Sequence, residues 1–264
     1  MTVLTVLTSS PPVLALAGLL GAALGSFIHT RADGPSSPFR RSACNVCRKN
    51  LGPLELVPVF SYVFLGGKCA GCKGRIPWRY PVVEAVLGIL FVLATVAADG
   101  NVTALLRTWF VLCVFTYTFL TDALRQDVSP LLMVGAAAVL VPVQLALGMP
   151  PGPLLLGALV GGGFFAAQHF VSKGKWVGLG DAWIGLALGV LLGFPGVLAA
   201  LLIAYASGAA VAVTLLAAGR MKRTSTMAFG PFLVSAGTVV LLWGPVLTTW
   251  YWRLTDAIGE RLYG

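Results

Sequence analysis

Two aspartates border apolar segments of this chain, where acidic side chains are rare. The chain has 264 residues; Asp122 closely follows the apolar run 102–120, and Asp181 ends a Gly-Leu-Gly-Asp sequence that begins at Gly178. An ionisable group at membrane depth is costly, so it persists where it faces a cavity, finds a partner or does chemistry. Two apposed carboxyl groups in a partly dry site do not both ionise easily; one keeps its proton while the other activates water. The pair therefore predicts acid–base hydrolysis around a scissile carbonyl.

Each aspartate also has a purely structural interpretation. Asp181 could cap the N-terminus of a helix, and Asp122 could lie at a membrane interface near Arg125. Gly178 and Gly180 would let the backbone approach another segment closely, or let the helix begin late. Most of the other acidic residues are interpreted as loop or terminal groups.

Four of the five cysteines form two Cys-x-x-Cys pairs. These are Cys44 with Cys47 and Cys69 with Cys72, and 21 residues separate the pairs. Four thiolates at this spacing can close a tetrahedral zinc site, which would be structural because it leaves no open position for water. Two disulfides are the alternative, and a reducing cytosol would disfavour them. A bound metal would stabilise a segment too short to build its own core.

The composition identifies the solvent around most of the chain. Hydrophobic residues make up 58% and charged residues 10%, and the mean hydropathy is +0.90. A soluble domain is about a quarter charged, so this chain lacks the polar side chains to cover a soluble core. Disorder is excluded as well, because disordered chains are poor in apolar residues. Most of the chain is therefore expected to lie in a bilayer.

Eight segments are long and apolar enough to cross a membrane as helices. Gly, Ala and strong helix formers dominate them, and the alternation of a membrane β-barrel is absent. The sequence therefore predicts an all-α polytopic membrane protein of about eight transmembrane helices. The predicted spans are 12–30, 82–98, 102–120, 130–149, 153–170, 176–193, 195–218 and 228–250.

The basic residues gather on one side of this predicted topology. The insert 31–81 holds nine of the 18 Lys and Arg residues, and the loops 121–129, 171–175 and 219–227 hold six more. With eight spans, the positive-inside rule places these segments and the two aspartates at the cytoplasmic face, with both termini outside. The net charge of +9 is thus interpreted as topology signals and contacts with membrane lipids. No nucleic-acid partner is expected, because no binding motif accompanies the charge.

Taken in chain order, the motifs of this sequence resemble those of the type IV prepilin peptidase family of GxGD membrane aspartic proteases. The resemblance covers some 200 residues. Its elements, in chain order, are Gly25-Ser26-Phe27-Ile28-His29, Cys44-Asn45-Val46-Cys47, Val57-Pro58-Val59-Phe60-Ser61-Tyr62, Gly67-Lys68-Cys69-Ala70-Gly71-Cys72, Ile76-Pro77-Trp78-Arg79-Tyr80-Pro81-Val82-Val83-Glu84, Asp122 with Pro130, Gly178-Leu179-Gly180-Asp181, and Phe229-Gly230-Pro231-Phe232-Leu233.

The resemblance implies an endopeptidase of the bacterial inner membrane with Asp122 and Asp181 as its catalytic residues. Family members cut the basic leader from prepilins and pseudopilins at the cytoplasmic face, and many then methylate the new N-terminus with S-adenosylmethionine. The chain then divides into a first transmembrane helix at 1–30, a cytoplasmic zinc-binding insert at 31–81, and a seven-helix protease core at 82–264. The sequence fits substrates of pilus, secretion and DNA-uptake systems equally well. It is also compatible with any oligomeric state.

For methyl transfer, the resemblance points to the region 31–84. Glu84 and Arg79 are expected at the entrance to the second span, as contacts for the substrate amine or the methyl donor. A helix N-terminal carboxylate, favoured by the macrodipole, is the alternative for Glu84. Ser26 and His29 could line the same site, although close helix packing also explains them.

The chain departs from the family pattern at three places. His29 replaces the usual Asn, and Trp183 stands where a Lys often follows the second aspartate. The segment after Asp122 carries Arg125 and Asp127, and Asp127 is a rival for the first catalytic position.

Two other functions are compatible with the same residues. A transporter could use the aspartates to relay protons or bind a cation, although they lie at one face rather than the midplane. A non-enzymatic scaffold for pilus or secretion assembly could use the zinc insert to bind cytoplasmic partners.

Overall fold

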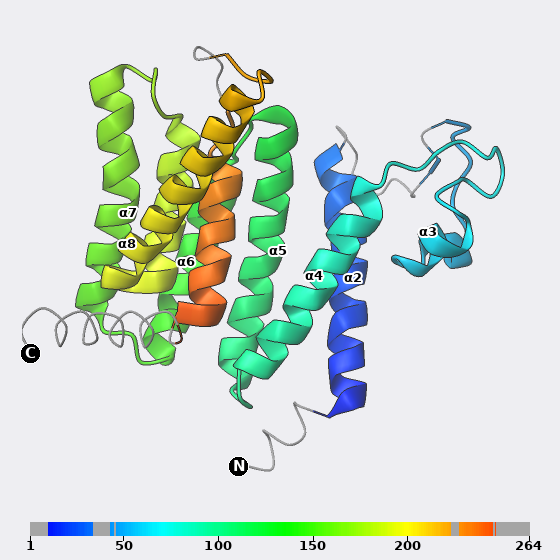
Figure 1. Cartoon of the computed structure of the whole chain (residues 1–264). Coiled ribbons are helices and arrows are strands. Elements are labelled where there is room, and N and C mark those ends of the chain that lie inside the picture. The colour runs from blue at the N-terminus through cyan, green and yellow to red at the C-terminus, as the bar shows by residue number, and fades with distance from the viewer. Residues whose placement is uncertain (1–9, 34–42, 45, 223–226, 245, 247–264) are drawn as a thin grey trace, which may run out of the picture. The chain divides into compact units, whose positions relative to one another are not determined.

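The chain is helical almost throughout the part that the structure describes (Figure 1). The computed structural model describes residues 10–33, 43–44, 46–222, 227–244 and 246. Across these residues there are helices and two isolated β-bridges but no strand. The predicted all-α membrane architecture is therefore confirmed. Arg40 and Arg41 of the predicted insert, and the end of the predicted last span, lie outside the described residues.

The chain forms two compact units, Met1–Gln126 and Asp127–Gly264. Unit 1 contains the helices α2 (Pro11–Asp33), α4 (Arg79–Ala97) and α5 (Val102–Arg125), with the short helices η1 (Pro53–Leu56) and α3 (Phe60–Phe64) in the polar insert. Close contact joins α2 to α4. A Cβ on Gly21 would lie 2.7 Å from the Leu87 carbonyl oxygen, and one on Gly88 would lie 2.9 Å from the Gly18 carbonyl oxygen.

Unit 2 contains α6 (Pro130–Ala146), α7 (Pro151–Ser172), α8 (Leu179–Ala217) and a helix at Gly230–Gly244. The 39-residue α8 is broken at Gly193 and Phe194, and Gly193 has the positive φ of 63° that glycine tolerates best. Figure 1 shows the chain turning at this break. Its two halves correspond to the predicted spans 176–193 and 195–218, so each of the eight predicted segments falls on a helix.

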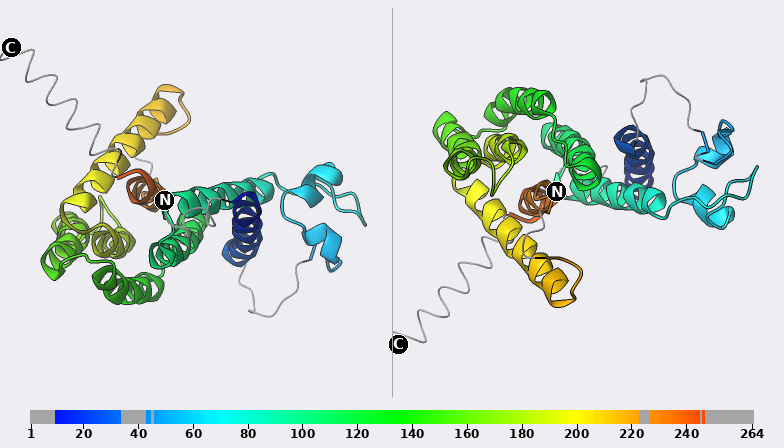
Figure 2. Two further views of the ribbon diagram at one scale, coloured as in Figure 1. Left: turned by 90° about the horizontal axis from the view of Figure 1, so that it is seen from below. Right: turned by 90° about the horizontal axis from the view of Figure 1, so that it is seen from above.

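Local signals set where these helices begin. Asn101 caps α5 by accepting a hydrogen bond from the Ala104 N–H at 3.0 Å, and Ser129 caps α6 through the Leu132 N–H at 3.3 Å. Proline occupies the first position of α2, α6 and α7, where its missing N–H costs nothing. In the views along the helices, the helix 230–244 lies beside the second half of α8 (Figure 2), and the rings of Phe229 and Tyr205 are 4.9 Å apart.

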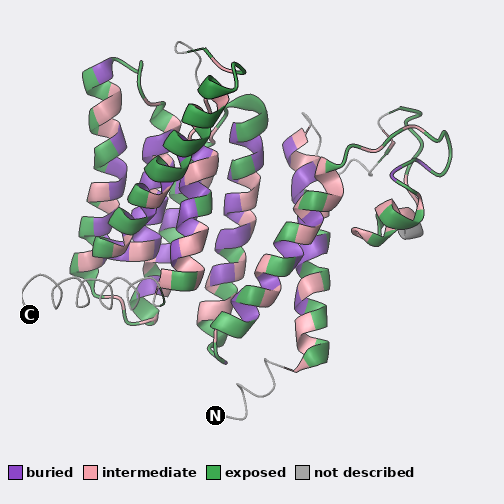
Figure 3. Cartoon of the chain, in the orientation of Figure 1, coloured by how far each residue is buried: buried purple, intermediate pink, exposed green. Residues whose placement is uncertain are grey.

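Glycines bring the backbones of α7 and α8 into direct contact. A Cβ on Gly161 would lie 2.1 Å from the Gly185 carbonyl oxygen, and one on Gly189 would lie 2.0 Å from the Gly157 carbonyl oxygen. Membrane helices depend on such close packing because lipid supplies no hydrophobic force between them. Within each unit, the buried residues gather on the helix sides that face one another (Figure 3).

A buried glutamine compensates for the break in α8. The Leu191 carbonyl would receive its helical hydrogen bond from residue 195, which is a proline without an N–H. Gln144 of α6 is 1% exposed, and its Nε2 donates to this carbonyl instead. An unsatisfied carbonyl is especially costly in a bilayer, so the hydrogen bond fixes α6 against α8.

We expect Gly161→Ala to destabilise unit 2, because the new methyl group collides with backbone rather than with a mobile side chain. Overpacking of this kind costs about 1–3 kcal/mol. The matched control is Gly163→Ala in the same helix, where a Cβ meets nothing within 4 Å. Thermal unfolding in detergent should show a lower Tm for Gly161→Ala and an unchanged or slightly higher Tm for the control. Equal Tm values for both variants would contradict the proposed contact.

Candidate functional site

Asp122 lies in the last turn of α5 in unit 1. Its side chain is 7% exposed, and the preceding residues Leu120 and Thr121 are buried as well. The helix ends four residues later because Gln126 adopts left-handed angles, with φ 53° and ψ 40°, and its N–H donates to the Asp122 carbonyl at 2.8 Å. Asp127, the rival position, is exposed, as is Arg125. Burial thus distinguishes Asp122 from its neighbours as the carboxyl group held away from water.

Asp181 lies in the first turn of α8 in unit 2. Gly178 is the N-cap of this helix, and the Asp181 side chain is 8% exposed. A Cβ on Gly180 would lie 2.9 Å from Cβ of Val128, so the segment before α6 lies directly against the motif. Gly180 is therefore required by close contact, whereas a Cβ on Gly178 would meet only atoms at 3.9 Å or beyond.

His169 positions the loop that leads into this motif. Its Nδ1 lies 2.9 Å from the Val177 carbonyl oxygen, and Ser172 Oγ accepts a hydrogen bond from the Trp176 N–H at 3.2 Å. The loop between α7 and α8 is thus held by side chains of the last turn of α7. Sequence reasoning gave His169 no role, because no motif signals a contact between residues eight apart across a turn.

The four predicted zinc ligands come together in the insert of unit 1. The Sγ atoms of Cys44, Cys47, Cys69 and Cys72 all lie within 4.8 Å of one another, and all four cysteines are free thiols. The two pairs have the same backbone structure. The Cys44 N–H donates to the Lys49 carbonyl, and the Cys69 N–H donates to the Gly74 carbonyl, both at 2.9 Å. The structure therefore brings two equivalent knuckles together around one point.

The charges within the cysteine cluster suit a divalent cation. The backbone N–H groups of Cys47 and Val46 lower the pKa of the Cys44 thiol to about 6. Although the Gly74 N–H favours its thiolate, hydrogen bonds with the other thiols raise the pKa of Cys72 to about 11. Four thiolates in one cluster repel each other unless a metal ion neutralises them. A set of four sulfur donors in this arrangement fits Zn²⁺.

A cavity of about 150 Å³ lies between the insert and the ends of α2 and α4. Among the residues that line it are Ser26 and Thr30 from α2, Tyr80 and Glu84 from α4, and Cys44 and Ser61 from the insert. The cavity thus has polar groups from two long helices on one side and the cysteine knuckles on the other. Of the predicted contacts for a substrate amine or methyl donor, Ser26 and Glu84 share this wall.

Glu84 joins α4 to the insert. Its side chain is 8% exposed, and its Oε2 accepts a hydrogen bond from the Val59 N–H at 2.7 Å. Val59 has a φ of 61°, which is strained for a β-branched residue, so the hydrogen bond helps to hold an unfavourable backbone. Glu84 lies beyond the first turn of α4, where the helix dipole contributes little. Its position is explained by this contact and by the cavity it lines.

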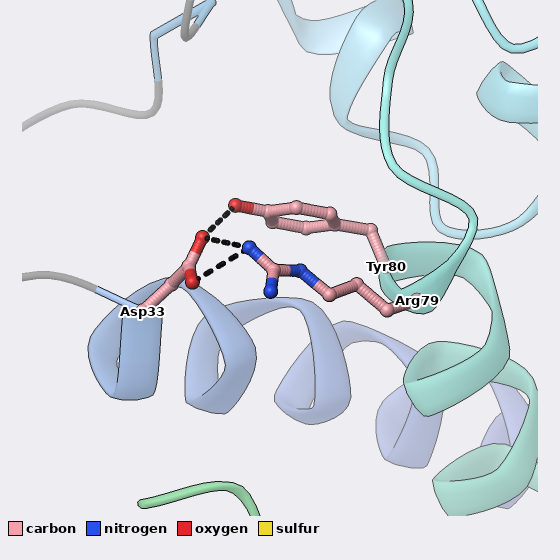
Figure 4. A network of polar contacts seen from close by, with 3 residues as sticks. All are labelled: Asp33, Arg79 and Tyr80. Carbon is pink, nitrogen blue, oxygen red and sulfur yellow. Dashed lines mark hydrogen bonds and ion pairs between the residues drawn. The ribbon is translucent and has the colours of Figure 1, made fainter. Parts of the chain in front are cut away.

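Arg79 and Tyr80 fasten the start of α4 to the end of α2 (Figure 4). Arg79 Nη2 donates to both carboxylate oxygens of Asp33, at 2.8 and 3.0 Å, and the Tyr80 hydroxyl donates to Asp33 Oδ2 at 2.6 Å. Asp33 is one of the acidic residues that sequence reasoning interpreted as loop groups. Its partners lie 46 and 47 residues away in the sequence, and no local sequence pattern predicts these contacts. Arg79 is thus engaged within the protein.

His29 lies in the contact between α2 and α4. It is fully buried, and its ring packs on the Tyr80 ring with centroids 3.9 Å apart. Tyr80 therefore contacts the Asp33 carboxylate through its hydroxyl and His29 through its ring. His29 thus packs between the two helices and is not among the residues that line the cavity of unit 1. Neither of its buried ring nitrogens has a hydrogen-bond partner among the described residues.

Comparison with known proteins places these features in a family. Residues 19–98, which contain both cysteine knuckles and most of the cavity wall, match the family model described as Bacterial Peptidase A24 N-terminal domain. No solved structure gives a significant match.

Similar curated proteins cover most of the chain. A prepilin leader peptidase/N-methyltransferase of Aeromonas salmonicida is 32% identical over 216 residues, which are 80% of this chain and 74% of that protein. Proteins of the same name from Pseudomonas aeruginosa and Bacillus subtilis are 31% and 28% identical, over 80% and 92% of this chain and 74% and 99% of their own lengths. This similarity agrees with the helical membrane fold and the cysteine cluster. The chain belongs to the prepilin leader peptidase/N-methyltransferase family.

Proposed function

We propose that this protein cleaves the leader peptide from prepilin-like substrates, with Asp122 and Asp181 as its catalytic residues. The observation that carries the proposal is the burial of both aspartates at the ends of apolar helices, where a carboxyl group without a function is costly. The relatives named prepilin leader peptidase/N-methyltransferase support the substrate class. The active site would face the cytoplasm of a bacterial inner membrane, the side that the basic loops favour.

The two helix ends suggest different roles for the two carboxyl groups. Asp181 lies in the first turn of α8, at the positive end of a helix dipole, which stabilises an anion. Asp122 lies in the last turn of α5, at the negative end, where an anion is disfavoured. Asp181 would therefore remove a proton from the attacking water, and Asp122 would hold its proton toward the carbonyl oxygen.

The reaction then balances within the pair. The water oxygen bonds to the carbonyl carbon, its proton passes to Asp181, and the carbonyl oxygen takes the proton of Asp122. As the C–N bond breaks, the departing amine receives a proton from Asp181, and the new acid returns one to Asp122. A substrate whose own helix lies in the bilayer would present its scissile bond at the interface, near the exposed end of α5.

We expect Asp122→Asn and Asp181→Asn each to lower the cleavage rate by about 10²–10⁴-fold, the usual contribution of a general acid or base. Mass spectrometry of a purified prepilin in detergent would follow loss of the leader. Asp127→Asn is the matched control, because this nearby carboxylate is exposed, and its rate should stay close to wild type. Unchanged cleavage by a folded Asn variant would contradict the catalytic pair. No cleavage by the wild-type protein would favour the scaffold, or the transporter if proteoliposomes showed proton flux.

We further propose that methyl transfer uses the cavity of unit 1. S-adenosylmethionine, when bound, would supply an electrophilic methyl group carried on a sulfonium. Glu84, anchored by Val59, places an anionic group on the cavity wall beside Ser26. This carboxylate would bind the ammonium of the new N-terminus and take its proton before the amine is methylated. The Ser26 and Glu84 side chains on the cavity wall and the name of the relatives support this assignment.

We expect Glu84→Gln to lower methylation about tenfold or more, because a charge-assisted hydrogen bond contributes about 1.5–3 kcal/mol. The amide oxygen of Gln can still accept from the Val59 N–H, so the insert should stay folded. Cleavage by this variant should change little, and Asp99→Asn, at an exposed carboxylate after α4, should change neither activity. Methylation and cleavage would be read from one mass spectrum. A proportional loss of both would refute a separate methyl-transfer role.

Zinc is the metal that we propose for the cysteine cluster, in a structural role. Cys72→Ser should lower bound zinc from one ion per chain to nearly none, because the tetrahedral set loses a thiolate. The matched control is Cys113→Ser in α5, outside the cluster, which should keep the full metal content. Elemental analysis by mass spectrometry measures the outcome. Loss of zinc from the control, or full zinc content in Cys72→Ser, would contradict the assignment.

A further inference from the structure

The short helix α3 turns a large apolar face outward. Phe60, Val63 and Phe64 are 55%, 68% and 85% exposed, and their i, i+3, i+4 spacing places them on one side of the helix. Ser61 and Tyr62 lie on the opposite side and line the cavity of unit 1. The helix therefore forms part of the cavity wall with one face and offers three large apolar side chains on the other.

The residue Val57, just before α3, enlarges this surface. Val57 is 38% exposed, which makes four large apolar side chains exposed within eight consecutive residues, whereas its neighbour Leu56 lines the cavity. Contiguous exposed apolar surface on a polar segment marks a site of interaction. We call Val57, Phe60, Val63 and Phe64 the α3 patch.

We propose that the α3 patch inserts into the surface of the bilayer that holds α2 and α4. α3 lies to the side of these two helices, at the level of their upper halves rather than beyond their ends (Figure 1). The views along the helix axes also place the insert beside α2 and α4 (Figure 2). Ser61 and Tyr62 share a cavity with residues near the end of α2 and the start of α4. Because both helices are long and apolar enough to span the membrane, these helix ends mark the edge of the bilayer.

Charge on the same segment fits lipid headgroups. Residues 43–79 carry six Lys and Arg side chains and one acidic side chain, Glu55. Lys68, Lys73 and Arg75, which follow α3, are all exposed. Basic residues next to exposed apolar ones are typical of segments that lie in the interface of an anionic membrane.

An aromatic residue at the start of α4 supports the same depth. Trp78 is 71% exposed and directly precedes Arg79, the first residue of this candidate span. Tryptophan is enriched where membrane helices meet the headgroup layer. The chain thus leaves the bilayer beside Trp78, close to where the α3 patch would enter it.

Binding of α3 to the bilayer would position the cavity. Ser61 and Tyr62 belong to the same helical turn as the patch, so lipid contact on one face fixes the cavity wall on the other. The insert would then be held at three places: the cysteine cluster, the Glu84 contact with Val59, and the lipid surface.

Quenching by lipid tests this arrangement directly. A fluorescent coumarin amino acid would replace Phe64, and the full protein would be placed singly in nanodiscs whose acyl chains carry bromine, a contact quencher. The same probe at Ile89, an exposed residue within α4, gives the value for lipid contact, and at Lys49, in a cysteine knuckle, the value for water. We expect quenching at position 64 to approach that at position 89. Quenching as weak as at position 49 would overturn the proposal.

A second probe site and a charge series keep the test decisive. If the probe at position 64 lowers zinc content, Val63 takes its place. Quenching should be stronger in phosphatidylglycerol than in phosphatidylcholine, and replacing Lys68, Lys73 and Arg75 by Gln should remove this difference. Lipid preference that survives these replacements would refute the charge argument. A probe shielded from water only after a prepilin or a second copy is added, without bromine quenching, would identify a protein partner and overturn the lipid assignment.

Discussion

Inside a bilayer no water replaces a missing hydrogen bond, and this constraint governs where the polar groups of both units lie. Buried hydroxyl groups on the long helices of unit 1 donate to carbonyls four residues earlier: Thr95 to Phe91, Thr108 to Ala104 and Thr118 to Val114. In unit 2, Gln144 supplies the donor that Pro195 cannot give to the Leu191 carbonyl. A carboxylate has no proton to donate to such a carbonyl. The burial of Asp122 and Asp181 therefore depends on other interactions, and it is the feature from which we propose their catalytic role.

Backbone geometry sets where each aspartate lies within its helix. Gln126 adopts a left-handed backbone conformation and ends α5 one turn after Asp122. Gly178 is the N-cap of α8, three residues before Asp181. One carboxyl group thus lies at a helix C-terminus and the other at an N-terminus, where the helix dipoles have opposite signs. In the mechanism that we propose, this difference assigns the acid and base roles to two identical side chains.

Sequence alone was enough for the features that depend on local composition. Each apolar run became a helix because length and hydropathy decide membrane insertion, and the Cys-x-x-Cys spacing fixed both knuckles. Contacts between distant residues were not predicted. Asp33 meets Arg79 across 46 positions and Val59 meets Glu84 across 25, and neither pair has a periodic signature. The lipid-facing side of α3 was also missed, since a five-residue helix is too short for amphipathic periodicity to stand out.

The contacts within the insert explain how a polar segment can form one wall of a cavity. The Asp33–Arg79 pair closes a long, polar chain segment, and closure entropy rises only with the logarithm of loop length, so one ion pair can close it without making it rigid. Rigidity has to come from contacts within the loop. The cysteine cluster draws both knuckles to one point, and Glu84 fixes the strained Val59 just before α3. With these restraints the segment can form one stable wall of the cavity, although it is too short to build a hydrophobic core of its own.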